Sequence, residues 1–199
     1  IRACVAAGLG NAEGDPVKVL FYPTYLRPND GLMNMSYYDV VSGMDIGIFP
    51  SRYEPFGYTP LEAGLKLNAA VSTDAAGFGR YLQEQVDLTD RGVKILHLGD
   101  GKGEKAIAGQ QAGGAPTASG PLSAADELAD FMELLYYSHH SKLEHYKDDS
   151  YRLMHLFDWK ILIANYLKAY SLAAQRKFGK EGKIVELGLP PQGKERVMR

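Results

Sequence analysis

Short apolar runs, separated by polar stretches, indicate the first elements of the chain. Four runs are rich in β-branched and aromatic residues, are too short for helices, and lie at 17–22, 46–49, 69–73 and 93–98. They alternate with stretches of helical spacing. This alternation predicts an α/β fold, a Rossmann-like parallel sheet with helices on both faces and a ligand crevice at the carboxyl ends of its strands.

Two predicted helices carry a capping box, in which a serine is followed three residues later by an aspartate. The pairs are Ser36 with Asp39 and Ser123 with Asp126, at the starts of helices over 36–42 and 121–138. Residues 1–10 are typical of a helix end, whereas 99–120 predict a long loop. Residues 151–178 have a helical pattern in which Asp158 caps a new helix opening with Trp159.

The stretch 45–79 joins two strand ends to two glycine-bearing loops. In the first loop, the sequence T-P-L-E has the form of a helix start, with Thr59 as the N-cap and Glu62 as its capping-box partner. The amides of Gly57, Tyr58 and Thr59 then lack intrahelical acceptors at the positive end of a helix dipole. Such a helix start favours a phosphate ligand.

The second loop, at 75–79, follows the strand at 69–73. Its glycines, Gly77 and Gly79, predict a backbone that comes close to a ligand before a helix begins near Arg80. Both loops therefore lie where the carboxyl ends of parallel strands meet.

These residues also carry a resemblance to a known family. The sequence Y-E-P-F-G-Y-T-P-L-E at 53–62 has two glutamates eight residues apart, and G-F-G follows at 77–79. This pattern resembles the donor-site signature of glycogen synthases of the animal and fungal type, which are retaining glucosyltransferases of the GT-B fold. The likeness covers most of 17–85 and 121–178, including L-F-D-W at 156–159.

The resemblance implies that the chain is the C-terminal, nucleotide-sugar-binding half of such an enzyme and is truncated at its N-terminus. Residues 1–178 are then the donor-nucleotide-binding domain, and 179–199 form a C-terminal extension. The implied reaction transfers glucose from UDP-glucose to the non-reducing end of an α-1,4-glucan with retention of configuration. The acceptor glucan is expected to bind through the missing N-terminal domain, and the isolated fragment is expected to be inactive.

Glu54 is the catalytic candidate, because the resemblance implies that it accepts hydrogen bonds from glucose hydroxyls and orients the ring. A nucleophilic role is less favoured, since no second carboxylate stands beside it in the loop. Glu62 either closes the capping box or holds the ribose hydroxyls, and Tyr37 either stacks on the uracil or is an ordinary amphipathic tyrosine. The other donor-binding candidates are Gly57, Tyr58, Thr59, Gly77, Phe78 and Gly79.

Composition narrows the classes of partner. A net charge of −2, from 22 basic and 24 acidic residues, gives no electrostatic reason to expect nucleic acid or an acidic membrane. Cys4 is the only cysteine, so no intrachain disulfide can form, and no apolar run reaches membrane-spanning length. We therefore expect a cytoplasmic protein, and the oligomeric state stays open. We expect no metal or other cofactor, because fixed donors can stabilise the charge of a leaving diphosphate without one.

Two alternatives to UDP-glucose transfer stay open. One is an ADP-glucose-dependent starch or glycogen synthase, or another GT-B transferase, and the other is a non-catalytic nucleotide-sugar-binding module. In the eukaryotic members that the chain resembles, a helix before the Asp-Trp pair carries an arginine cluster that receives glucose 6-phosphate. Here 139–152 holds only Lys142, Lys147 and Arg152 as permanent cations, so we expect no response to that effector.

Overall fold

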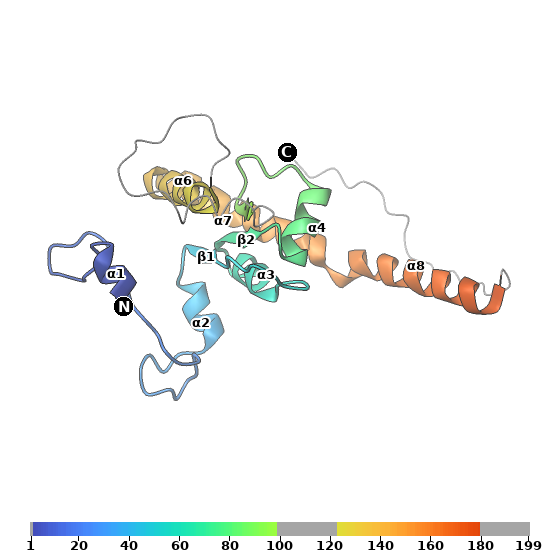
Figure 1. The fold of residues 1–199 in the computed structure, drawn as a ribbon, viewed down its shortest axis with the longest axis horizontal. Coiled ribbons are helices and arrows are strands. Elements are labelled where there is room, and N and C mark those ends of the chain that lie inside the picture. Colours follow the sequence, from blue (N-terminus) through green and yellow to red (C-terminus); the bar gives the residue numbers. More distant parts are fainter. Residues whose placement is uncertain (1, 99–122, 180–199) are drawn as a thin grey trace, which may run out of the picture. The chain divides into compact units, whose positions relative to one another are not determined.

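The computed structural model describes residues 2–98 and 123–179 of the chain (Figure 1). The chain forms two compact units, 1–151 and 152–199, and each is described by itself. The predicted loop at 99–120 and nearly all of the predicted extension lie outside the described residues. The predicted domain boundary stays a prediction.

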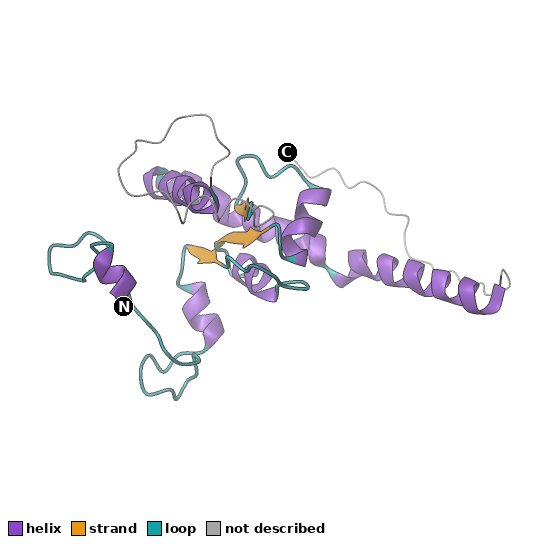
Figure 2. Ribbon diagram, viewed as in Figure 1, coloured by secondary structure: helices purple, strands orange, loops and turns teal. Residues whose placement is uncertain are grey.

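Three parallel strands form the sheet of the first unit (Figure 2). They are β1 (Ile46–Ile48), β2 (Ala69–Thr73) and β3 (Val93–Leu96), in the order β1-β2-β3. The register pairs Ile46 with Ala69 and Ala70 with Val93. All residues of the central strand β2 are buried. Three of the four predicted strands are thus confirmed, as is the parallel α/β sheet.

The strand predicted at 17–22 is wrong. Val17, Leu20 and Phe21 are 53, 72 and 66% exposed, and no strand within the described ranges pairs with this segment. A strand is stable only where a neighbour completes its backbone hydrogen bonds and buries one face. Here the backbone of Val19 is instead held by the Asn11 side chain, through two hydrogen bonds of 2.7 Å.

Helices α3 (Tyr58–Leu65) and α4 (Gly77–Gln85) cover one face of the sheet. Helix α3 approaches the sheet closely, since a Cβ on Gly47 of β1 would lie 2.9 Å from the Ala63 Cβ of α3. Phe78 and Leu82 of α4 are fully buried. Burial of each such side chain contributes about 1.5–3 kcal/mol to the hydrophobic stabilisation of this layer.

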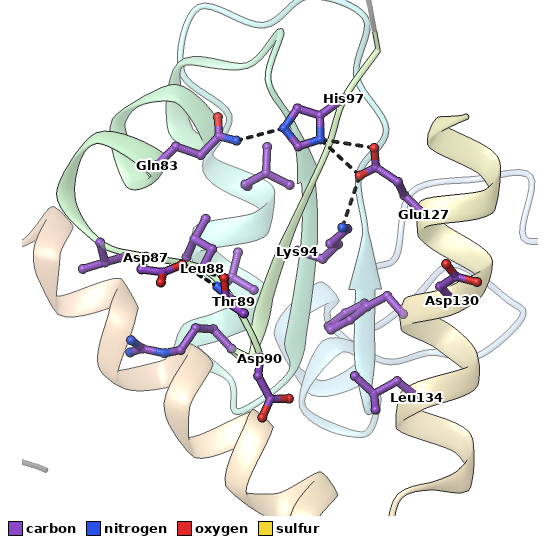
Figure 3. A pocket seen from close by; sticks show the side chains of 15 residues that line it. Gln83, Asp87, Leu88, Thr89, Asp90, Lys94, His97, Glu127, Asp130 and Leu134 are labelled. Carbon is purple, nitrogen blue, oxygen red and sulfur yellow. Dashed lines mark hydrogen bonds and ion pairs between the residues drawn. The ribbon is translucent and has the colours of Figure 1, made fainter. Parts of the chain in front are cut away.

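Helix α6 (Ala124–Tyr137) covers the opposite face, and Figure 3 shows α4 and α6 on either side of β3. Helix α7 (His140–Met154) packs against the segment that leads into β3, where Asp149 accepts hydrogen bonds from Arg91 and from the Gly92 amide. The core on this side consists of Ala69, Val71, Leu96, Phe131, Leu135 and Tyr146.

Both predicted serine capping boxes are confirmed. Ser36 precedes α2 (Tyr37–Ser42), Ser123 precedes α6, and in each the serine oxygen accepts from the aspartate amide while the aspartate accepts from the serine amide. The predicted helix end near the start of the chain is also confirmed, because α1 (Arg2–Ala6) is followed by Gly8 at a φ of +77°.

In the second unit, the short 3-10 turn η1 (His155–Phe157) leads into α8 (Trp159–Phe178). As predicted, Asp158 caps α8, by accepting a hydrogen bond of 2.9 Å from the Lys160 amide. The rings of Trp159 and Tyr166 lie 4.9 Å apart along α8. None of the described helices combines the length and the hydropathy that crossing a membrane requires.

Candidate active site

Two loops meet at the carboxyl edge of the sheet, one after β1 and one after β2. Glu54 of the first loop pairs with Ala76 of the second in an isolated parallel bridge. The Gly77 amide donates to the Glu54 carbonyl at 3.1 Å, and the Phe78 amide donates to the Phe56 carbonyl at 2.7 Å. These bonds join the two loops into one surface, as expected from their positions in the sequence.

The predicted start of α3 is two residues late. The helix begins at Tyr58, and its N-cap is Gly57, whose φ is 100° and which has no side chain to bond the first amides. Only glycine adopts this conformation readily, so it turns the chain into the helix before Thr59 is reached. The capping box of Thr59 with Glu62 is therefore wrong.

The corrected start still leaves amide donors at the beginning of α3. In the part of the chain that the structure describes, no side chain caps this helix and no carbonyl outside it accepts from Gly57, Tyr58 or Thr59. Pro60 follows with no N–H of its own. The first turn therefore presents its donors at the positive end of the helix dipole, and anion binding by them stays a prediction.

The Glu54 carboxylate lies beside this helix start. A Cβ on Gly57 would lie 3.5 Å from both Cδ and Oε2 of Glu54, an ordinary contact distance, so the carboxylate lies directly beside the N-cap position. Ser51 Oγ donates to Glu54 Oε2 at 3.2 Å. Glu54 is partly buried, and a carboxylate oriented in this way can accept hydrogen bonds from a sugar.

The glycines of the second loop pack against the chain itself. A Cβ on Gly77 would lie 2.2 Å from the Pro55 carbonyl oxygen, and one on Gly79 would lie 2.2 Å from the Thr73 carbonyl oxygen. The helix α4 begins at Gly77 and not near Arg80, so the predicted length of this loop is wrong. The close approach that requires glycine is an approach of loop to loop and of helix to strand.

Phe78, between these glycines, belongs to the core. Its ring is fully buried and lies 6.4 Å from the ring of Phe56 in an edge contact. Tyr58, in contrast, is 67% exposed, and the centre of its ring lies 5.0 Å from the centre of the Phe56 ring. Donor binding by Gly77, Phe78 and Gly79 stays a prediction.

Glu62 lies beside two tyrosines of α2. The Tyr38 hydroxyl donates to Glu62 Oε1 at 3.0 Å, and the Tyr37 ring lies 5.3 Å from the Tyr38 ring. Burial, and then the negative charge of Glu62, raise the pKa of the Tyr37 phenol. The Tyr37 hydroxyl is buried and has no hydrogen-bond partner among the described residues. Tyr38 was not singled out from the sequence, because its contact with Glu62 spans 24 residues.

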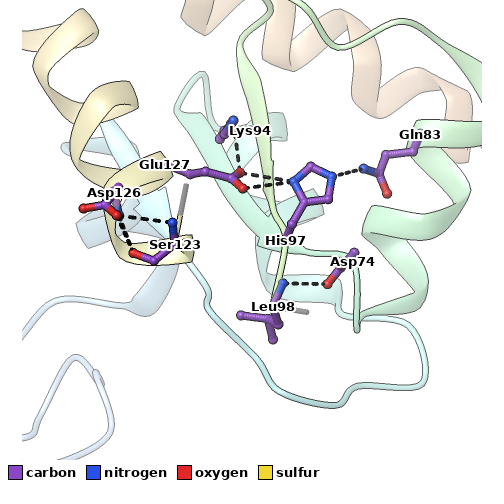
Figure 4. Close-up of polar contacts among 8 residues, drawn as sticks. All are labelled: Asp74, Gln83, Lys94, His97, Leu98, Ser123, Asp126 and Glu127. Atoms are coloured by element: carbon purple, nitrogen blue, oxygen red, sulfur yellow. Dashed lines mark hydrogen bonds and ion pairs between the residues drawn. The ribbon is translucent and has the colours of Figure 1, made fainter. Parts of the chain in front are cut away.

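A cavity of about 630 Å³ lies away from these residues (Figure 3). It lies between the end of α4, the residues 86–91, β3 and α6. Its polar groups bind one another (Figure 4). The Glu127 carboxylate accepts from Lys94 at 3.2 Å and lies 3.2 Å from His97 Nδ1. The other ring nitrogen of His97 contacts the Gln83 amide. We place the candidate site at the carboxyl edge, because the free donors and Glu54 converge there.

Among residues 2–98 and 123–179, no three His, Cys, Asp or Glu side chains are placed to hold one metal ion. The expectation that no metal takes part stays a prediction.

The fold and the site define a class, the parallel α/β proteins whose ligand loops meet at the carboxyl edge of the sheet. The chain belongs to the glycogen synthase family, whose sequence model matches residues 1–192. The resemblance stated from the donor-site signature is thereby confirmed at the level of the family.

Similar proteins from fungi and animals are named as members of the same family. Glycogen [starch] synthase isoform 1 of Saccharomyces cerevisiae is 28% identical over 175 residues, 88% of this chain and 23% of that protein. Human liver glycogen [starch] synthase is 31% identical over 185 residues, 92% of this chain and 24% of that protein. The enzyme of Caenorhabditis elegans is 42% identical over 89 residues, 44% of this chain and 13% of that protein. The chain thus spans at most about a quarter of each of these relatives.

Proposed function

We propose that the chain is the donor-nucleotide-binding part of a glycogen synthase with a GT-B fold. The proposed reaction transfers glucose from UDP-glucose to the non-reducing end of an α-1,4-glucan, with retention of configuration. The observation that carries the proposal is the position of the Glu54 carboxylate beside the free amides at the start of α3. A glucosyl diphosphate needs both features, a hydrogen-bond acceptor for the sugar and donors for the phosphates.

The amides of Gly57, Tyr58 and Thr59 have the role of stabilising the diphosphate. Negative charge develops on the leaving group as the glycosidic bond breaks, and donors fixed in advance stabilise it without reorganising. The dipole of α3 adds to their effect within the first turn. Basic residues outside this chain are expected to complete the neutralisation.

Glu54 has the role of orienting the glucose ring. Its oxygens accept hydrogen bonds from sugar hydroxyls, and an oriented bond that strengthens in the transition state raises the turnover number. The partners of the donor's nucleoside are Glu62, for the ribose hydroxyls, and the Tyr37 ring, for the uracil. The contact of Glu62 with Tyr38 supports a fixed carboxylate at this position.

The glucan acceptor is assigned to a domain that precedes this chain in the full-length protein. The relatives are about four times as long as the segment they share with this chain, which supports a second domain on the far side of the cleft. The chain alone is then expected to bind UDP or UDP-glucose weakly and to transfer no glucose.

The test is a glucosyl-transfer assay on the full-length protein, with glycogen as acceptor and UDP-glucose and ADP-glucose compared in parallel. We expect transfer from UDP-glucose. Transfer from ADP-glucose alone would support the alternative donor, and nucleotide-sugar binding without transfer would support the non-catalytic module.

The first prediction concerns Glu54 in the same assay. Glu54→Gln removes the charged acceptor but keeps the size of the side chain, so turnover should fall on the order of tenfold to a thousandfold while the melting temperature changes little. Glu84→Gln is the matched control, because Glu84 is an exposed glutamate of α4 outside the site. Equal turnover of the two variants would remove Glu54 from the mechanism.

A further inference from the structure

The Glu54 side chain is held by a hydroxyl from its own loop. Ser51 Oγ donates to Glu54 Oε2 at 3.2 Å. This bond fixes one carboxylate oxygen, while Oε1 accepts from no side chain in the ranges that the structure describes. The free oxygen is the one that can accept a hydrogen bond from a ligand.

Ser51 is itself anchored to the sheet. Its carbonyl oxygen accepts a hydrogen bond of 2.6 Å from Thr73 Oγ1, and its amide donates to the Phe49 carbonyl at 2.9 Å. Thr73 is the last residue of β2 and is fully buried. The serine is therefore bonded to the central strand, all of whose residues are buried, and not only to its own loop.

The backbone of Glu54 is held by the same part of the fold. Its carbonyl accepts from the Gly77 amide at 3.1 Å, at the start of the helix that follows β2. The main chain of Glu54 is thus bonded to the first residue of α4, and its carboxylate is connected through Ser51 to Thr73, the last residue of β2. Because the main chain and one carboxylate oxygen of Glu54 are already held, the side chain loses little rotamer freedom when a ligand binds.

We propose that Ser51 is a positioning residue for Glu54, and that Thr73 anchors Ser51. The hydroxyl of Ser51 holds Oε2 so that Oε1 faces the sugar of the donor. This inference rests on the proposed function, in which Glu54 orients the glucose ring. A catalytic group displaced by about 1 Å loses on the order of a hundredfold in rate, so a residue that fixes its orientation affects turnover without touching the substrate.

The experiment measures kcat and KM for UDP-glucose in the full-length protein carrying Ser51→Ala. We expect kcat to fall roughly tenfold, with KM changed less than about twofold and a melting temperature close to wild type. Ser51→Thr keeps the hydroxyl and should retain at least about a third of wild-type kcat. Ser138→Ala is the control, because Ser138, the C-cap of α6, donates to the Leu134 carbonyl away from the site, and its loss should leave kcat unchanged.

A double variant separates positioning from a purely structural role. If Ser51 acts through Glu54, Ser51→Ala combined with Glu54→Gln should have the kcat of Glu54→Gln alone, since the group to be positioned is already lost. Two effects that multiply would overturn the inference. Thr73→Ser should preserve kcat, whereas Thr73→Val should lower it, because only serine keeps the hydroxyl that bonds Ser51.

The outcomes distinguish the two levels of the proposal. A wild-type protein that transfers no glucose from either nucleotide sugar would refute the proposed function, and the inference with it. An active wild type in which Ser51→Ala keeps its kcat would refute the positioning role alone.

Discussion

At the scale of single residues, two glycines of the site are required for different physical reasons. Gly57 is required by its conformation, since its φ of 100° strains any other residue. Gly79 has ordinary helical conformation but no room for a Cβ, which would meet the Thr73 carbonyl at 2.2 Å. Sequence alone indicates neither reason, because both positions belong to a glycine pattern that also suits a ligand.

The difference gives a prediction for Gly79→Ala. In a solvent-exposed helix this change stabilises the folded state by about 1 kcal/mol, because alanine has the higher helix propensity. Here the new methyl group meets backbone that cannot move away, so we expect the free energy of unfolding to fall by about 1–3 kcal/mol. Thermal and urea denaturation of the full-length protein measure it. Gly10→Ala is the control, since nothing lies within 4 Å of a Cβ there.

A stability of Gly79→Ala equal to wild type would contradict this packing. It would show that α4 sits further from β2 than described, which would reopen the possibility that the glycine faces a ligand.

At the scale of elements, the sequence predicts best those features that depend on near neighbours. The boxes of Ser36 and Ser123 each involve residues three apart, and both were predicted correctly. The strand at 69–73 was predicted with its bounds, because a short run of small and β-branched residues is followed there by a glycine-bearing loop. The prediction of Thr59 as the N-cap was wrong, because the backbone conformation of Gly57, and not side-chain chemistry, determines where α3 begins.

Features that depend on distant partners could not be predicted. The segment 17–22 has the composition of a strand, but pairing depends on which neighbour is present. The bonds of Ser51 to Thr73 and of Tyr38 to Glu62 join residues 22 and 24 apart, and no local pattern indicates them. The sequence therefore predicts that the two loops meet at the carboxyl edge of the sheet, but not the contacts that orient their side chains.

The contact of α7 with the entry to β3 gives a prediction at this scale. Asp149 accepts hydrogen bonds from Arg91 Nε at 2.8 Å and from the Gly92 amide at 2.9 Å, and its side chain is only 13% exposed. Asp149→Asn removes the charge that both donors face, and its amide nitrogen cannot accept the bond that Oδ1 accepts from Arg91 Nη2 at 2.8 Å. We expect the free energy of unfolding to fall by about 1–3 kcal/mol, measured by urea denaturation.

The matched control is Glu144→Gln on the same helix. Glu144 pairs with Lys147 at 3.2 Å but is 51% exposed, so its loss should change stability by less than about 0.5 kcal/mol. Equal effects of the two substitutions would mean that Asp149 is an ordinary surface charge.

At the scale of the whole molecule, membership of the glycogen synthase family raises the question of regulation. The eukaryotic members that the chain resembles respond to glucose 6-phosphate through an arginine cluster on the helix before the Asp-Trp pair. The corresponding helix here is α7, and its permanent cations are Lys142, Lys147 and Arg152. A dianionic phosphate needs several converging donors, preferably the planar forks of arginine.

The structure supports the view that these cations do not form such a cluster. Lys147 lies 3.2 Å from both Asp45 and Glu144, and Lys142 lies over the Tyr146 ring at 5.4 Å. Cations five residues apart on a helix are rotated by about 140° from one another, so the lysines occupy different sides of α7. The lysine charges are engaged within the fold and do not converge.

We therefore predict that the full-length enzyme is constitutively active and insensitive to glucose 6-phosphate. The measurement is the rate of glucose transfer from UDP-glucose at pH 7.5, with and without millimolar glucose 6-phosphate. A responsive member of the family serves as the positive control, and inorganic phosphate serves as the control for ionic strength. A severalfold activation would contradict the prediction, and would place the effector site on cations outside this helix.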